Sequence, residues 1–178
     1  MNSRLLFLFL GAWALAEAPP PTHCSIRNAD GSGWRPSVDH ARNVVRNADA
    51  IVRVRAAHLD SLRSRGVDRF VVLEILDGYD GDSVPPSLSV YGWLADTDDY
   101  NPRAVPYPAV RPAGLLGSCF AEEYRQGAEY LLLLKREDRQ LTPYWAALAP
   151  TNEQIRGPDD PWVLWVLAER RRVRSGNR

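Results

Sequence analysis

Residues 117–121, with the sequence GSCFA, form the segment of this chain that comes closest to a covalent catalyst, with Cys119 as the candidate nucleophile. A cysteine attacks a substrate as the thiolate, and an adjacent imidazole commonly supplies the base that forms it. The histidines of the chain are His23, His40 and His58, and all of them precede Cys119. The segment therefore has a thiol with no following base.

This segment resembles the one around the nucleophile of papain-type proteases. In that family the cysteine lies near the mature N-terminus and its histidine follows far along the chain. Cys119 lies in the second half of this chain, and no histidine comes after it. We therefore predict that Cys119 is not catalytic and that the protein is not an enzyme.

Other chemical motifs are missing from the sequence. It has no G-x-S-x-G elbow, no H-E-x-x-H pair, no glycine-rich phosphate loop and no Cys/His cluster with zinc spacing. The acidic segment 77–82, DGYDGD, lacks the later glutamate of a calcium loop, and we interpret it as a solvated hairpin turn. We predict no catalytic residue, no metal site and no cofactor.

The N-terminus has the pattern of a secretory signal peptide over residues 1–18. Arg4 precedes a continuous apolar run, and the small residues Ala16 and Ala18 supply a cleavage site. No later segment approaches the roughly 18 consecutive apolar residues of a membrane span. We expect a periplasmic or secreted protein without a transmembrane segment, whose mature chain begins at Pro19.

Cysteine content agrees with export. Two cysteines in an exported chain are most economically explained by one disulfide, so we pair Cys24 with Cys119. This disulfide would close a loop of about 95 residues, for which chain entropy predicts a stabilisation on the order of 4 to 5 kcal/mol.

Composition indicates one ordinary domain over residues 19–172, followed by a basic tail, 173–178. The chain is 45% hydrophobic and its formal net charge is zero. The charge is unevenly distributed, because residues 70–102 contain seven acidic residues and no lysine or arginine. A net charge of zero argues against a dedicated nucleic-acid binder, and we expect a monomer.

Hydrophobic periodicity divides the chain into helices and strands. A period of 3.6 and an N-cap, Ser37, predict a helix over 38–47, and Asp160 followed by Pro161 predicts a helix over 161–172. Period-two alternation or continuous apolar character predicts five strands, over residues 48–56, 69–78, 87–93, 129–135 and 140–145. The C-terminal helix could pack across the open end of the sheet or lie on a membrane surface, and we expect the packing.

Five short strands with a helix before and after them predict a mainly β fold. We expect a five-stranded OB-type Greek-key barrel with a short N-terminal helix and a C-terminal helix.

The order of these segments resembles the netrin-like modules and the N-terminal domain of the tissue inhibitors of metalloproteinases. In that family an early cysteine pairs with one just before a Gly-x-x-Tyr-Leu strand, and Gly127, Tyr130 and Leu131 match this pattern. The resemblance covers roughly Cys24 to Trp162. It implies the OB-type fold and the same disulfide.

The inhibitory chemistry of that family does not carry over to this chain. Those inhibitors chelate a protease zinc through the amino group and carbonyl of an N-terminal cysteine, whereas Cys24 would be the sixth residue of the mature chain. The family's other disulfides are also missing. The resemblance therefore implies the fold and the disulfide, and zinc chelation would require further processing that exposes Cys24 as the first residue.

Binding candidates come from aromatic residues and from a long insertion, 94–117, that is rich in proline. This insertion could present a contact surface, in which case deletion of Tyr100 to Pro112 should leave the thermal transition nearly unchanged, or it could wrap the barrel with its tyrosines covering core. The aromatic candidates are Tyr91, Trp93, Tyr100, Tyr107, Tyr144 and Trp145. We expect an unknown protein partner, such as a hydrolase, on the insertion; the alternative is a glycan or small ligand in an aromatic groove, and we expect no nucleic acid.

Overall fold

The computed structural model describes residues 34–65, 69–116 and 118–176 of the chain. The predicted signal peptide and Cys24 lie outside the described residues, so the cleavage site and the disulfide stay predictions. The elements, in chain order, are α1 (Val38–Asn47), β1 (Ala50–Leu59), β2 (Phe70–Gly81), β3 (Ser87–Tyr91), β4 (Trp93–Ala95), the 3-10 turn η1 (Pro112–Leu115), β5 (Glu123–Arg125), β6 (Glu129–Glu137), β7 (Gln140–Pro143), β8 (Asn152–Ile155) and α2 (Pro161–Gly176).

Both predicted helices are confirmed together with their N-caps. At α1 the Ser37 hydroxyl accepts a hydrogen bond from the backbone N–H of Asp39 (3.2 Å). At α2 the Asp160 carboxylate accepts one from the backbone N–H of Trp162 (2.9 Å). Each cap satisfies a backbone donor that has no partner inside the helix. Since α2 continues to Gly176, the predicted basic tail begins inside this helix.

The main sheet is antiparallel, and its strands follow the order β3-β2-β1-β6-β7. β8 is a sixth strand that pairs with the first half of β6, while β7 pairs with its second half. β4 and β5 form a separate parallel pair. The mainly β prediction is confirmed, and the five predicted strands are β1, β2, β3, β6 and β7. Strands β4, β5 and β8 were not predicted.

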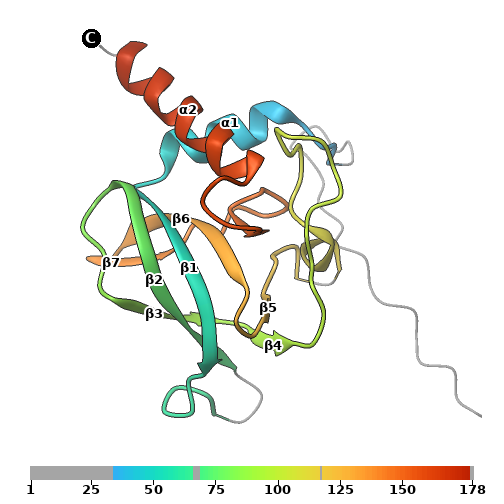
Figure 1. Cartoon of the computed structure of the whole chain (residues 1–178), viewed down its shortest axis with the longest axis vertical. Helices are drawn as coiled ribbons and strands as arrows, with labels where there is room; N and C mark the ends of the chain where they lie inside the picture. Colours follow the sequence, from blue (N-terminus) through green and yellow to red (C-terminus); the bar gives the residue numbers. More distant parts are fainter. Residues whose placement is uncertain (1–33, 66–68, 117, 177–178) are drawn as a thin grey trace, which may run out of the picture.

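The two end strands of the main sheet, β3 and β7, approach each other because the sheet curls (Figure 1). Within the described residues no strand pairing joins them, so the predicted closed barrel is not seen. The candidate functional site lies in the space between these two strand edges.

The central strands β1 and β6 are buried on both faces over residues 50–52 and 130–134, whereas Arg53 is partly exposed and Arg55 exposed farther along β1. Ile51 and its cross-strand neighbour Leu133 pack toward α1 and α2, whereas Val52 and Leu132 pack inside the curl of the sheet. Figure 1 shows the two helices side by side over one face of the sheet. A strand covered on both faces needs apolar residues at successive positions, which explains the run of four leucines in β6.

The C-terminal helix is anchored on the body of the protein. The Arg170 guanidinium donates to the backbone carbonyls of Arg46 (2.8 Å) and Ala48 (2.9 Å) at the end of α1 and forms an ion pair with Asp80. A cation at a helix C-terminus satisfies its free carbonyls and its dipole. Asp80 also pairs with Arg174 (2.5 Å). The helix does pack on the sheet, but on the outer face of the curl rather than across its open end, the position expected from the sequence. Among the described residues, no helix is long and apolar enough to cross a membrane.

The insertion 94–117 is part of the core. Tyr107 is 7% exposed, and its ring stacks on that of Trp162 with 4.7 Å between centroids. Ala109, Val110 and Arg111 are buried as well. Burial therefore supports the alternative in which the tyrosines of this segment cover core. Deletion of Tyr100 to Pro112 would remove buried apolar area, so burial argues against the expectation that such a deletion leaves the thermal transition nearly unchanged.

Candidate functional site

The structure separates the six aromatic candidates into different environments. Tyr91 on β3 is 38% exposed and, with Trp145, lines the groove between β3 and β7. Trp93 on β4 is 39% exposed but does not line this groove. Tyr107 is a core residue, as described above, and Tyr144 packs on the core beneath the helices. Two of the six residues are therefore brought together.

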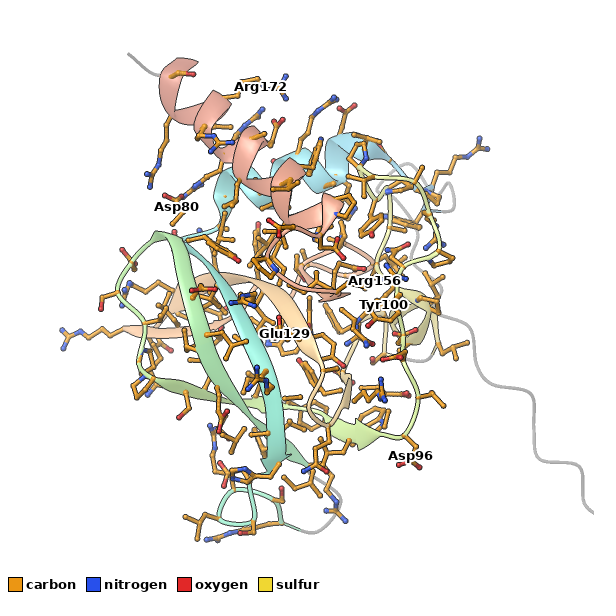
Figure 2. All side chains as sticks on the ribbon, viewed as in Figure 1. Asp80, Asp96, Tyr100, Glu129, Arg156 and Arg172 are labelled. Carbon is orange, nitrogen blue, oxygen red and sulfur yellow. The ribbon has the colours of Figure 1, made fainter. Side chains whose placement is uncertain are left out.

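Tyr100 lies in a third environment. Its ring is covered by the Arg156 guanidinium, whose central carbon lies 4.1 Å from the ring centroid (Figure 2). The backbone of Tyr100 bridges to Gln154 on β8. This tyrosine therefore holds the insertion against β8 rather than facing the groove.

The groove between β3 and β7 has a volume of about 490 Å³. Its walls come from the turn after β1, the start of β2, the β2–β3 connection, strand β3, the hairpin of β6 and β7, and Trp145 after β7. The aromatic residues Phe70, Tyr91 and Trp145 line it, and the rings of Phe70 and Tyr91 meet edge to face at 5.9 Å. These rings give the groove an apolar surface between two strand edges.

Three arginines line the groove, and none of its described lining residues is Asp, Glu, His or Cys. The Arg63 guanidinium lies 4.4 Å from the centre of the Phe70 ring and donates to the backbone carbonyl of Ser89 (3.2 Å), on the free edge of β3. The Arg136 guanidinium is paired with Asp82 (2.6 Å). For the Arg139 guanidinium, the described part of the chain offers no hydrogen bond or ion pair.

Arg139 lies in a tight turn with unusual backbone geometry. Asp138 (φ 45°) and Arg139 (φ 71°) join β6 to β7 as a two-residue hairpin turn with positive φ at both positions. Turns of this type favour glycine at the second position, because a side chain in the left-handed region costs roughly 1 to 2 kcal/mol. The protein thus places a long cationic side chain where glycine would be more stable.

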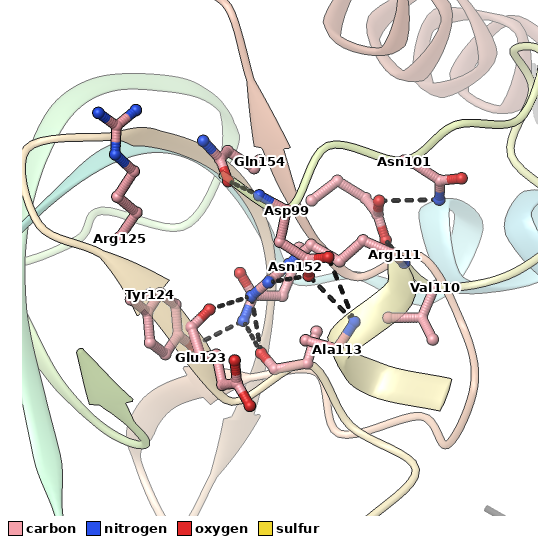
Figure 3. Close-up of polar contacts among 12 residues, drawn as sticks. Asp99, Asn101, Val110, Arg111, Ala113, Glu123, Tyr124, Arg125, Asn152 and Gln154 are labelled. Atoms are coloured by element: carbon pink, nitrogen blue, oxygen red, sulfur yellow. Dashed lines mark hydrogen bonds and ion pairs between the residues drawn. The ribbon is translucent and has the colours of Figure 1, made fainter. Parts of the chain in front are cut away.

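A second polar cluster centres on Arg111, which is fully buried. Its guanidinium donates to the carboxylate of Asp99 (2.6 Å) and to three backbone carbonyls, those of Asn152 (2.8 Å), Ala121 (3.0 Å) and Glu123 (2.7 Å), as Figure 3 shows. We call Arg111, Asp99, Asn101, Asn152 and Glu153 the Arg111 network. It ties the insertion to β5 and β8.

Glu153 is the most strongly perturbed acid of this network. One carboxylate oxygen accepts from the backbone N–H of Arg111 (3.0 Å), and the other accepts from the side-chain amide of Asn101 (2.9 Å). Burial raises the pKa of Glu153 to about 8, although these hydrogen bonds and the Arg111 charge favour the ionised form. Both oxygens are occupied by protein donors, which leaves no position for a substrate.

The surroundings of the network offer little space for a ligand. The neighbouring cavity has a volume of about 180 Å³ and is lined in part by Asp98, Asp99, Arg125 and Tyr130. Arg125 forms an ion pair with Asp98 (2.6 Å), and its backbone N–H donates to the Tyr130 hydroxyl (2.7 Å). In the described ranges, no group of three or more His, Cys, Asp or Glu side chains is placed to hold a metal ion. The Arg111 network is therefore structural.

Cys119 lies beside this network and is partly buried against a small apolar cluster that includes Val110, Ala121 and Leu148. Its backbone carbonyl accepts from the N–H of Leu148 (2.8 Å). No cysteine in the described part of the chain is free. The pairing with Cys24 stays a prediction.

Sequence reasoning missed most of the groove and all of the Arg111 network. Arg136 and Arg139 lie in the short polar segment 136–139 between two predicted strands. A hairpin predicted from this spacing could have placed both arginines at the edge of the sheet. Arg63 and Phe70 flank the connection between two predicted strands. The network offered no local signal, because Arg111 and Glu153 lie in segments without periodicity.

No protein-family model matches this chain, and no curated protein or solved structure is significantly similar to it. The candidate site therefore has to be interpreted from its own geometry.

Proposed function

We propose that this protein is an exported, non-enzymatic binding module of the OB type, and that it holds a glycan or another small ligand in the groove between β3 and β7. The observation that carries the proposal is the groove of about 490 Å³, where Tyr91 and Trp145 lie between two free strand edges. Ligand sites are typically concave, largely apolar and equipped with a few polar groups.

The topology supports an OB-type fold. An OB-type barrel has five strands in Greek-key order and is partly open, and it binds through the face of its second and third strands and through the loops between strands one and two and strands four and five. Here β1, β2, β3, β6 and β7 follow that order. The groove is lined from β2, β3, the turn after β1 and the β6–β7 hairpin, which are the corresponding elements.

The resemblance to netrin-like modules is consistent with this topology and remains part of the proposal. So do the signal peptide over residues 1–18 and the Cys24–Cys119 disulfide, which together suggest a periplasmic or secreted location.

A ligand in the groove is better supported than a protein partner on the insertion. A protein partner would need an accessible contact surface, but Tyr107, Ala109 and Val110 are buried in the insertion. The aromatic residues of the groove are partly exposed and concave in arrangement. The geometry thus favours the glycan or small-ligand alternative.

The absence of an acid–base pair in the groove supports a binding role. A general acid or base has to lie within hydrogen-bond reach of the reacting group. The described lining residues include no Asp, Glu, His or Cys, the side chains that most often act as a general acid or base. The acid with the raised pKa, Glu153, is enclosed in the Arg111 network.

Matched aromatic variants test this proposal. Tyr91 and Trp93 are almost equally exposed, but only Tyr91 lines the groove. The mature protein is applied to an array of neutral, carboxylated and sulfated glycans, and Kd is then measured by calorimetry for the members that bind. Tyr91→Ala and Trp145→Ala should weaken binding at least tenfold, and Trp93→Ala should leave Kd unchanged.

Two results would overturn the proposed site. The first is that no glycan binds the mature protein. The second is that Trp93→Ala reduces affinity as much as Tyr91→Ala does, since binding would then lie outside the groove.

A further inference from the structure

We propose that the groove selects an acidic oligosaccharide, and that Arg139 is the residue that recognises its oxyanion group, a carboxylate or a sulfate. This inference rests on the proposed function and adds the charge of the ligand and the residue that reads it.

The first observation is the charge of the lining. Three arginines, Arg63, Arg136 and Arg139, come from two separate segments of the chain, and no carboxylate among the described residues lines the groove. Glu137 and Asp138 belong to the same hairpin as Arg139 but do not line the groove. An anionic group in the groove would thus meet cations without a competing lining carboxylate.

The second observation is that two of these arginines are already engaged. Arg136 pairs with Asp82 and also donates to the backbone carbonyl of Arg139 (3.2 Å). Arg63 covers the Phe70 ring and donates to the edge carbonyl of Ser89. The Arg139 guanidinium has no such partner in the described part of the chain, so its donors are available to a ligand.

The third observation is the backbone of Arg139. With φ at 71°, this residue occupies the position of the hairpin turn where glycine is favoured. Unfavourable backbone conformations persist only where the surrounding structure enforces them, and they are concentrated at active and ligand-binding sites. The cost of the turn is explained if the guanidinium binds a ligand.

The remaining lining fits a sugar better than a nucleic acid or a peptide. Ser83, Ser87 and Gln140 present hydroxyl and amide groups that match the many hydroxyls of a sugar. A single-stranded nucleic acid would require a basic track along its whole backbone, and Asp82 next to Arg136 interrupts one. An acidic sugar needs only one or two cations beside aromatic faces.

The experiment uses the mature protein and matched ligands. The acidic glycan that binds best on the array is compared with its methyl ester if it is carboxylated, or with its desulfated form if it is sulfated. Hexa-aspartate and a six-nucleotide thymidine oligomer are measured alongside. Arg139→Gly is the test variant. Arg46→Ala, which removes a cation of α1 outside the groove, is its control.

We expect the acidic glycan to bind at least tenfold more tightly than its neutral form. Arg139→Gly should weaken binding of the acidic form about threefold to tenfold, in line with a partly exposed ion pair, and should leave the neutral form unchanged. Arg46→Ala should change neither. The charge-dependent part of the affinity should decline as salt is raised.

Several results would overturn the inference. If neutral glycans bind as tightly as acidic ones and still depend on Tyr91, the proposed function stands but charge selection does not. Tighter binding of hexa-aspartate or of the thymidine oligomer would assign the groove to a peptide or to nucleic acid. If Arg139→Gly affects both glycan forms equally, Arg139 acts on the shape of the hairpin and not on the anion. If no glycan binds, the proposed function fails as well.

Discussion

The Arg111 network and the β3–β7 groove both contain arginine beside aromatic rings, yet they differ in how the cation is satisfied. Arg111 is fully buried, makes four hydrogen bonds through its guanidinium and has the Tyr130 ring centroid 5.2 Å away. Arg139 is exposed and has no partner in the described residues. The first arginine is therefore a structural cross-link, while the second is available for binding.

This difference changes how a perturbed pKa is interpreted here. Strongly shifted pKa values often mark functional sites, but buried ion-pair networks shift them as well. The pKa of Glu153 is raised by burial, and both of its oxygens are occupied by Asn101 and Arg111. The described lining of the groove has no Asp, Glu, His or Cys. In this protein the raised pKa of Glu153 therefore belongs to a buried hydrogen-bond network and does not mark the proposed site.

The largest expected effect concerns the predicted disulfide between Cys24 and Cys119. Replacing Cys24 and Cys119 by serine should lower the free energy of unfolding by about 4 to 5 kcal/mol, because a loop of about 95 residues would no longer be closed in the unfolded chain. Urea denaturation measures the change. Rapid alkylation of Cys119 by iodoacetamide in the unreduced protein would contradict the disulfide.

A matched pair of arginine substitutions tests the comparison directly. Arg111→Met should lower the free energy of unfolding by about 3 to 5 kcal/mol, since it removes the ion pair with Asp99 and the guanidinium donors of the Asn152 and Glu123 carbonyls. Arg139→Met should change it by less than about 0.5 kcal/mol. Equal losses of unfolding free energy in urea denaturation would mean that Arg111 and Arg139 contribute equally to the stability of the fold.

The pH dependence of stability tests Glu153. Burial raises its pKa in the folded protein to about 8, from an ordinary value of 4.5. The stability that this group contributes is complete below pH 4.5 and is lost as the pH rises toward 8. The free energy of unfolding should therefore fall by roughly 5 kcal/mol across this window, at about 1.4 kcal/mol for each unit of pKa shift.

Glu153→Gln isolates this contribution, because glutamine cannot ionise. The difference in unfolding free energy between the two proteins, followed by urea denaturation at several pH values, removes the contribution of other groups. Among these is His40, whose pKa is lowered by burial. A difference that is constant from pH 4.5 to 8 would mean that the donors Asn101 and Arg111 hold Glu153 ionised throughout.

The aromatic residues of the two regions should also differ. Tyr107→Ala should cost about 3 kcal/mol, because it removes a core ring stacked on Trp162 and leaves a cavity. Tyr91→Ala should cost less than about 1 kcal/mol, since this ring is partly exposed. Thermal denaturation of both variants measures the contrast, and a larger loss for Tyr91 would make the groove part of the core.

The smallest expected effect has the opposite sign. Arg139→Gly should raise the free energy of unfolding by roughly 0.5 to 1 kcal/mol, because glycine relieves the positive φ of the hairpin turn at the cost of some chain entropy. Arg139→Lys keeps a side chain at this position and should leave stability unchanged. A loss of stability in the glycine variant would show that the arginine side chain supports the fold.

The local structure of this protein was predictable from its sequence because the signals are local. The N-caps Ser37 and Asp160 precede helices that begin at the next residue. The alternation of Val71 and Leu73 predicted a strand with one buried face, and the leucines of 131–134 predicted a strand buried on both. Hydrophobic period and capping are properties of neighbouring residues, so no tertiary information was needed.

Burial of the proline-rich insertion and the position of the groove were decided by the tertiary structure. Arg111 and Glu153 are 42 residues apart, and neither belongs to a periodic segment; only the packing of the insertion against β8 creates their network. The groove likewise exists because the sheet curls until β3 and β7 face each other, which brings Tyr91 near Arg139 across 48 positions of sequence. The residue type of a polar side chain does not reveal its hydrogen-bond partner when that partner is distant in sequence. Such pairs are brought together only by the packing of the whole domain.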